Sequence, residues 1–104
     1  MTAAGSKKQE DKIVDMGKLA KELFPEISME TFEEAFRQSI NTVLKKHQYQ
    51  QWSDVTSEQP LTRKNFFDSI LSESKVTLKN NGLREDQIDI LIEKLTRRNR
   101  RYLG

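Results

Sequence analysis

The 104-residue chain has no cysteine, only two prolines and four glycines, and no long apolar run. Without cysteine it can form neither a disulfide nor a thiolate metal site, and a reducing compartment fits best. Because apolar runs stop at about three or four residues, neither a signal peptide nor a membrane-spanning segment is expected. We therefore expect a soluble intracellular protein, cytoplasmic or nuclear, with no membrane contact.

The scarcity of glycine and proline also bears on the fold, because helices can run long without interruption. Hydrophobic residues make up 35% of the chain and charged residues 33%, which allows one small domain with a thin core. Residues 1–8 are small and polar and are expected to form a flexible tail. Residues 9–104 are expected to form a single helical domain.

Four segments carry apolar residues at the helical period. The first covers about residues 9–24, and Pro25 ends it. The second begins at the N-cap Ser28 or, in a competing start, at a capping box formed by Thr31 and Glu34. In this second segment the apolar residues fall most clearly on one face of a helix.

The third predicted helix is capped by Thr62 and stops at Gly82, which supplies a left-handed residue. The fourth covers about residues 84–102. Residues 48–61 lack periodicity and predict a long connection, with at most one short turn around Trp52. The prediction is an all-α, four-helix domain in which two helical hairpins are joined by a longer loop. Its expected core is Phe24, Phe32, Phe36, Ile40, Val43, Phe66, Phe67, Ile70, Leu71, Ile88, Leu91 and Leu95.

The last predicted helix begins acidic and ends in four arginines within five residues, which carry a charge of +4. Residues 1–96 instead sum to −2, from fourteen Lys/Arg against sixteen Asp/Glu. On a helix, Arg97 and Arg101 share an outer face with Lys94, and Arg98 and Arg100 flank it. Such a fan of guanidinium groups suits a phosphate backbone. The alternative is a solvated helix end whose arginines offset the helix dipole.

The string Thr-Arg-Arg-Asn-Arg-Arg, from Thr96 to Arg101, resembles the arginine-rich RNA-binding segments of phage antitermination N peptides. The resemblance covers six residues of 104 and implies affinity for RNA without placing the chain in that family. Because arginine recognises phosphate in either nucleic acid, the expected partner is RNA or DNA.

Apolar residues on the charged side of the same helix are a second candidate site. Leu83 and Ile90 lie there beside Lys94 and Arg97, which indicates a docking face. For Leu83 the alternative is burial under the preceding turn. Exposure of Ile90 would favour a protein partner, whereas its burial would favour phosphate. Trp52 is a further candidate contact that could stack on bases or instead close the end of the bundle.

No pattern predicts catalysis. His47 is the single histidine, and the sequence has no glycine-rich phosphate loop, nucleophile elbow or calcium loop. The adjacent acidic pairs point about 100° apart on a helix and cannot converge as an acid–base couple. We expect no enzyme, no cofactor, no metal and no small-molecule substrate.

The leading hypothesis from the sequence is a small non-enzymatic regulatory domain that contacts RNA or DNA phosphates through Arg97, Arg98, Arg100, Arg101 and Lys94. The alternative is a protein–protein adaptor or structural subunit. It would use a face formed by Leu83, Ile90 and Arg97 to hold an acidic partner or a second copy of the chain, with Trp52 as a further contact.

Overall fold

The fold is described from a computed structural model of the chain. It describes the backbone of residues 3–103 and the side chains of residues 9–55 and 57–98. This part of the chain contains helices and no strand, so the all-α prediction is confirmed. The helices are α1 Ala3–Leu23, α2 Met29–Lys46, α3 Trp52–Thr56, α4 Pro60–Asn80 and α5 Glu85–Leu103.

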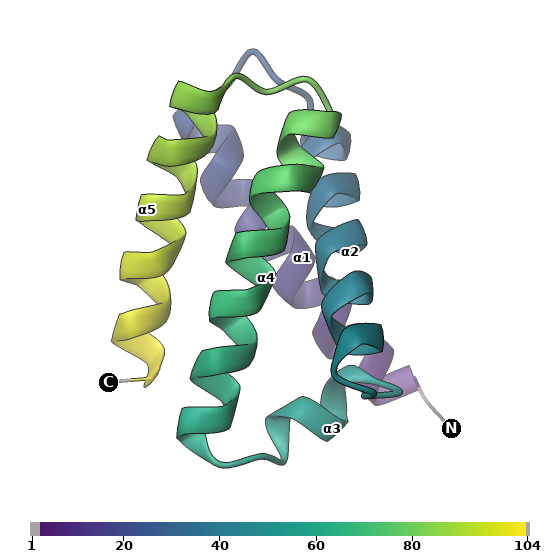
Figure 1. Cartoon of the computed structure of the whole chain (residues 1–104). Coiled ribbons are helices and arrows are strands. Elements are labelled where there is room, and N and C mark those ends of the chain that lie inside the picture. The colour runs from purple at the N-terminus through teal and green to yellow at the C-terminus, as the bar shows by residue number, and fades with distance from the viewer. Residues whose placement is uncertain (1–2, 104) are drawn as a thin grey trace.

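The four long helices run alternately up and down, and α1 crosses behind the row formed by α2, α4 and α5 (Figure 1). The largest helix–helix contact is between α2 and α4, while α5 packs mainly on α4 and more weakly on α1. The α1–α2 and α4–α5 connections lie at the upper end. The C-terminal end of α5 lies at the lower end, with α3 and the start of α4. Helix α5 is therefore an edge helix.

The core lies where the apolar faces of the long helices meet. Ten of the twelve residues expected in the core are buried, and the other two, Phe24 and Phe67, are partly buried and pack against it. Burial of this apolar surface is the main force that holds the helices together. The helical periodicity of the sequence therefore located the core correctly.

The structure decides between the caps predicted for the starts of α2 and α4. The Ser28 hydroxyl accepts a hydrogen bond from the Thr31 amide at 3.2 Å, so Ser28 caps α2 and the competing start at Thr31 is wrong. The expected cap of α4 at Thr62 is also wrong, because α4 begins at Pro60. Proline suits the first helical position, since the N–H it lacks would have no intrahelical partner there.

The start of α1 lies earlier than expected, at Ala3 instead of about residue 9. Alanine and lysine in this stretch are good helix formers and extend the helix toward the N-terminus. The flexible tail expected for residues 1–8 falls on residues whose side chains lie outside the described part, and it stays a prediction.

The turn between α4 and α5 follows the expected stop signal. Gly82 has φ +100°, and its amide donates to the Lys79 carbonyl at 3.0 Å. The Leu83 amide donates to the Leu78 carbonyl at 3.1 Å, which completes a Schellman motif. The motif brings the side chain of Leu83 back over the end of α4, where both leucines are buried.

The segment expected to be a loop is anchored by Trp52. Its ring packs edge-on against Phe66 and Phe67, with centroids 6.0 and 5.6 Å apart. Asp54 accepts the amide hydrogen of Gln51 at 3.2 Å and so supports the first turn of α3. Helix α3 therefore closes the lower end of the bundle with an aromatic cluster.

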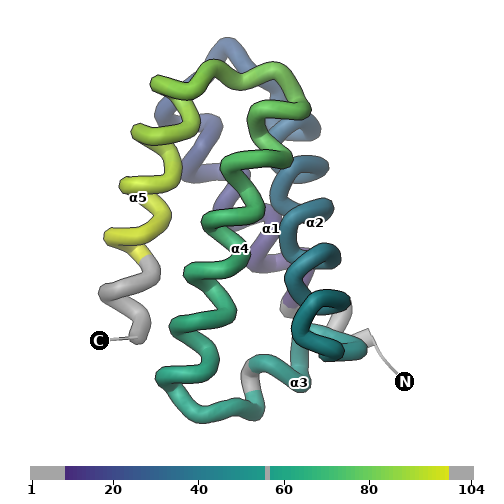
Figure 2. Tube along the Cα trace, in the orientation of Figure 1, coloured from purple at the N-terminus to yellow at the C-terminus, as the bar shows by residue number. Residues whose placement is uncertain are grey.

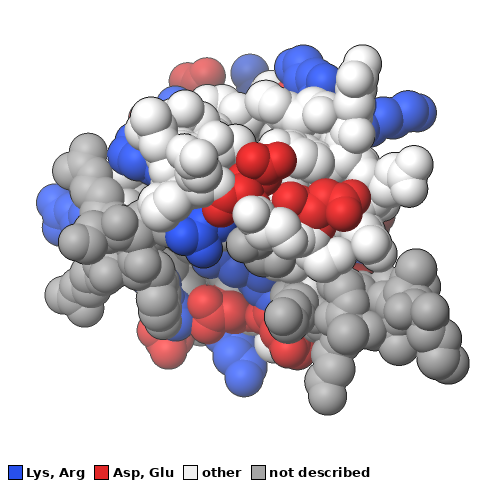
Figure 3. Space-filling model, turned by 90° about the horizontal axis from the view of Figure 1, so that it is seen from below, with Lys and Arg blue, Asp and Glu red and all other residues white. Residues whose placement is uncertain are grey.

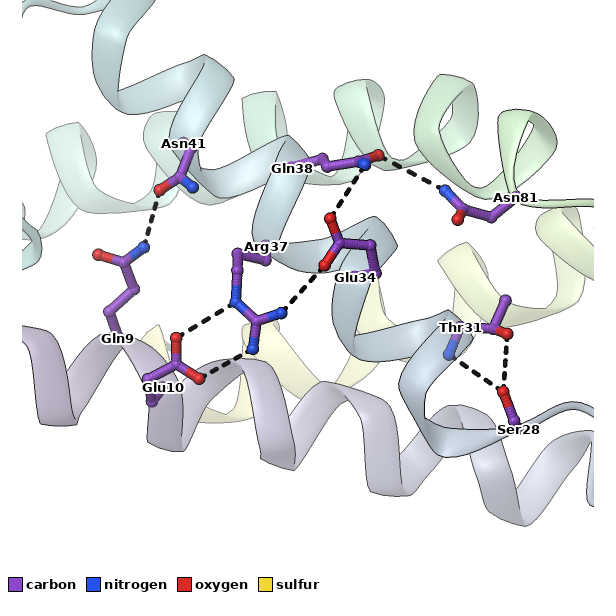
Figure 4. Close-up of polar contacts among 9 residues, drawn as sticks. All are labelled: Gln9, Glu10, Ser28, Thr31, Glu34, Arg37, Gln38, Asn41 and Asn81. Atoms are coloured by element: carbon purple, nitrogen blue, oxygen red, sulfur yellow. Dashed lines mark hydrogen bonds and ion pairs between the residues drawn. The ribbon is translucent and has the colours of Figure 1, made fainter.

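Polar contacts hold α1 against α2 (Figure 4). Arg37 donates to both carboxylate oxygens of Glu10 on α1, at 3.3 and 3.1 Å, and to Glu34 at 3.2 Å. The hydrogen bonds with Glu10 are the main reason why the pKa of Arg37 is raised above its ordinary value. Gln38 then links Glu34 to Asn81 at the end of α4. These side chains are committed to contacts within the bundle.

Candidate interaction surface on helix α5

The N-terminal end of α5 is set by local hydrogen bonds. The Gln87 side chain accepts the backbone amide hydrogen of Arg84 at 2.9 Å, as the third helical residue does in a capping box. The acidic residues Glu85 and Asp86 occupy the first turn, where negative charge is favourable. The inner side of the helix is apolar and buried, formed by Ile88, Leu91, Ile92 and Leu95. The rotation of α5 about its axis is thereby fixed.

The opposite side carries a mixed set of exposed residues, which we call the α5 outer face: Asp86, Ile90, Glu93, Lys94 and Arg97. These residues lie about 140–240° around the helix from Ile88. Ile90 is 47% exposed and is the large apolar side chain of this face. Asp86 precedes Ile90 along the helix, and the acidic Glu93 and the basic Lys94 and Arg97 follow it. The face therefore combines one apolar residue with charges of both signs.

Arg98 does not join this face. Its Nη2 lies 2.9 Å from Oδ1 of Asp15 on α1, and the two side chains are 35% and 40% exposed. Lys12 lies near this pair, since its charge interacts with both Asp15 and Arg98, and its Nζ lies 4.9 Å from the centre of the Phe67 ring. Burial lowers the pKa of Lys12, while Asp15 raises it and Arg98 lowers it further. Arg98 therefore serves the α1–α5 contact and is not available as part of a free basic surface.

Arg97 and Lys94 remain on the outer face. Arg97 Nη2 forms an ion pair with Glu93 one turn earlier, at 2.7 Å, and both side chains are well exposed. An exposed pair of this kind contributes at most about 0.5 kcal/mol, so a partner can displace it at little cost. At the other end of the face, Asp86 bonds to Arg84 at 3.1 Å, which lowers the pKa of Asp86.

Arg100 and Arg101 lie outside the residues whose side chains are described. The backbone of α5 continues through them to Leu103, and Figure 2 draws this end of the chain in grey. Their assignment to a nucleic-acid contact stays a prediction.

Two of the three apolar candidates are not on the surface. Leu83 is 5% exposed because the Schellman turn places it over α4, and Trp52 is 4% exposed because it fills the lower end of the core. Their burial agrees with the alternatives given for both residues, packing of Leu83 under the preceding turn and closure of the bundle end by Trp52. For Leu83 the reason is local, since the residue that follows the glycine of such a turn commonly packs back on the helix.

The charges at the lower end of the molecule are mixed. Viewed from below, the described Lys and Arg side chains are interspersed with Asp and Glu and do not form one continuous basic surface (Figure 3). A hollow between α2 and α4 is also mixed in charge, since its lining includes Lys46 together with Asp68 and Glu73. Neither arrangement resembles a phosphate groove lined by cations.

Among the described residues, the His, Asp and Glu side chains form no group of three or more that could hold a metal ion. Within the same part of the chain, no helix is both long and apolar enough to cross a bilayer. No protein-family model matches the sequence, and no curated protein or solved structure is significantly similar to it.

Proposed function

We propose that the protein is a small non-enzymatic adaptor or structural subunit that binds a protein partner through the α5 outer face. The exposure of Ile90 between charged residues carries this proposal. A phosphate partner has no use for an apolar side chain there, whereas a protein partner can cover it. We further propose that the fold consists of two helical hairpins, α1 with α2 and α4 with α5. This arrangement leaves α5 at the edge, where a partner can reach it.

The chemistry of the face defines the partner. Ile90 is about half exposed, so covering the rest of its side chain contributes about 1 kcal/mol. This apolar contribution to the binding free energy is modest. Charge complementarity therefore has to set the orientation of the partner and much of the selectivity of binding. The partner should therefore present carboxylates to Lys94 and Arg97 and an apolar residue to Ile90. Binding of this kind should weaken as salt is added.

Contact with nucleic acid is the second candidate. It is favoured by the helical backbone of α5 through the whole arginine segment, which suits a helix lying along a phosphate backbone. It ranks second for two reasons. Arg98 is paired with Asp15, and the carboxylates of Asp86 and Glu93 stand on the same face and repel phosphate.

The two candidates are distinguished by titrating the protein with three probes while recording amide NMR shifts. The probes are a short DNA duplex, an RNA hairpin and a synthetic acidic helix. The acidic helix has about 20 residues, enough to hold a helix, with glutamates flanking one leucine in every seven. If the protein is an adaptor, the acidic helix should change the NMR shifts of the α5 amides. Both Ile90→Ser and the double variant Lys94→Ala/Arg97→Ala should then reduce the affinity of the protein for this helix.

The matched control is Val76→Ser, which removes an exposed apolar residue from α4 and should leave binding unchanged. Binding of either nucleic acid that is insensitive to Ile90→Ser, with a log–log salt slope of about −3, would transfer the assignment to the second candidate. If no probe shifts the α5 amides, the outer face is not a binding surface of either kind.

A further inference from the structure

We infer that the partner of the α5 outer face is the same face of a second copy of this chain, with the two α5 helices antiparallel. This inference rests on the proposed function, because it names the partner of the same surface. The observation behind it is the order of charges along the face. Asp86 lies in the N-terminal half of the face, whereas Glu93, Lys94 and Arg97 lie in the C-terminal half and carry one negative and two positive charges, a net charge of +1. Ile90 lies between Asp86 and this group, and all five side chains are exposed.

Two copies of this face have complementary charges only when their α5 helices run in opposite directions. When two copies lie antiparallel, Asp86 of each copy faces the C-terminal half of the other face, whose net charge is positive. When they lie parallel, like charges face each other, which is unfavourable. A two-fold axis then makes every favourable contact occur twice, which is the usual geometry of a homodimer.

The helix rise places these contacts in register. If Asp86 of one copy faces Arg97 of the other, the two-fold axis passes between residues 91 and 92. Ile90 then lies about 2 Å along the helix from this axis, because each residue advances about 1.5 Å. The same register places Glu93 of each copy opposite Ile90 of the other, and the two Ile90 side chains lie within about one helical turn of each other along the helix. The Asp86–Arg97 pair occurs on both sides of them, about 8 Å from the axis.

Rearrangement within each copy costs little. In the single chain Asp86 is bonded to Arg84 and Arg97 to Glu93, and all four side chains are more than 60% exposed. Exposed pairs exchange partners readily. Because one helix face per copy is smaller than a standard stable interface, the dimer should be weak and should dissociate as salt is raised.

Sedimentation equilibrium over a range of protein and salt concentrations tests the inference. Asp86→Arg makes the face basic at both ends, and Arg97→Asp makes it acidic at both ends. Each variant alone should associate at least about tenfold more weakly than the wild type. An equimolar mixture of the two should restore association to within about threefold, since the heterodimer regains both opposite-charge pairs.

Ile90→Ser should also weaken association by about tenfold or more, whereas Val76→Ser and the charge control Asp68→Arg on α4 should leave it unchanged. Circular dichroism confirms that each variant is folded. The inference is overturned if the wild type stays monomeric at low salt, if the charge variants associate as well as the wild type, or if the mixture fails to restore association. If the acidic helix probe still binds in those cases, the adaptor function stands with a different partner.

Discussion

The ion pair between Arg98 and Asp15 decides how many arginines α5 can offer to a partner, and its strength can be measured. The charges are in direct contact at 2.9 Å, which corresponds to about 6 kcal/mol of Coulomb energy at an effective dielectric constant of about 20, before desolvation and salt screening are subtracted. Each side chain is more than a third exposed, so most of this is offset. We expect a coupling energy of about 1–1.5 kcal/mol, above that of exposed pairs and well below that of buried ones.

The two single variants should differ in cost. Asp15→Asn leaves the like charges of Lys12 and Arg98 close together without their carboxylate, and should destabilise the fold by about 2 kcal/mol. Arg98→Gln removes that repulsion and leaves Asp15 beside Lys12, so it should cost only about 1 kcal/mol.

Urea denaturation of the wild type, both single variants and the double variant gives the coupling energy directly. The exposed pair Lys64–Asp68, at 3.1 Å on α4, provides the reference cycle, with an expected coupling of about 0.3–0.5 kcal/mol. The reasoning is refuted if the Arg98–Asp15 coupling does not exceed this reference, or if Arg98→Gln costs more than Asp15→Asn. In the first case Arg98 would be free to face outward, and contact with nucleic acid would regain support.

Three further predictions use the same denaturation assay. Gly17→Ala should stabilise the fold by roughly 0.5 kcal/mol, because the gain in helix propensity exceeds the cost of moving the flexible end of Met29, 2.9 Å from the new methyl group; a clear loss of stability would show that α1 and α2 cannot adjust. Gly82→Ala should destabilise the fold by about 1 kcal/mol, because φ +100° at this position disfavours a side chain. Gln48→Gly should instead stabilise the fold by up to about 1 kcal/mol, because Gln48 has φ +62°. Changes in stability of the same sign for the two variants would contradict this reasoning. Between the lowered pKa of Lys12 and its ordinary value of 10.5, the unfolded chain holds a proton that the folded chain has released, so stability should rise with pH there and should not do so in Lys12→Met.

Much of the fold could be predicted because its determinants are local. Apolar residues at the helical period identified the four long helices and their buried sides. The hydroxyl of Ser28 and the glycine at position 82 act on their immediate neighbours, so each could be recognised from a few residues of sequence.

The features that the sequence left open depend on packing between distant segments. Helix α3 has five residues, too few to show a period, so the sequence predicted at most a short turn around Trp52. It holds its place because Trp52 and Val55 are buried in the core. Ser39 and Ser74 approach within 2.9 Å where α2 and α4 touch, a buried contact between residues 35 positions apart. The single hydroxyl proton of Ser74 can go either to Ser39 or to the Ile70 carbonyl, and no local pattern indicates that choice.

In the arginine segment, too, local helix geometry could be predicted from the sequence, whereas contacts with other helices could not. Helical geometry correctly separated Arg97 on the outer face from Arg98 on its flank, because the angle between consecutive residues is fixed at about 100°. What lies beside that flank is decided by the tertiary fold, and there α1 presents Asp15. Arg97 and Arg98, which are adjacent in the sequence, are thus divided between an exposed face and a contact with α1. The same helix leaves its acidic first turns uncovered, so the exposed face carries both signs of charge and is better suited to a protein surface than to phosphate.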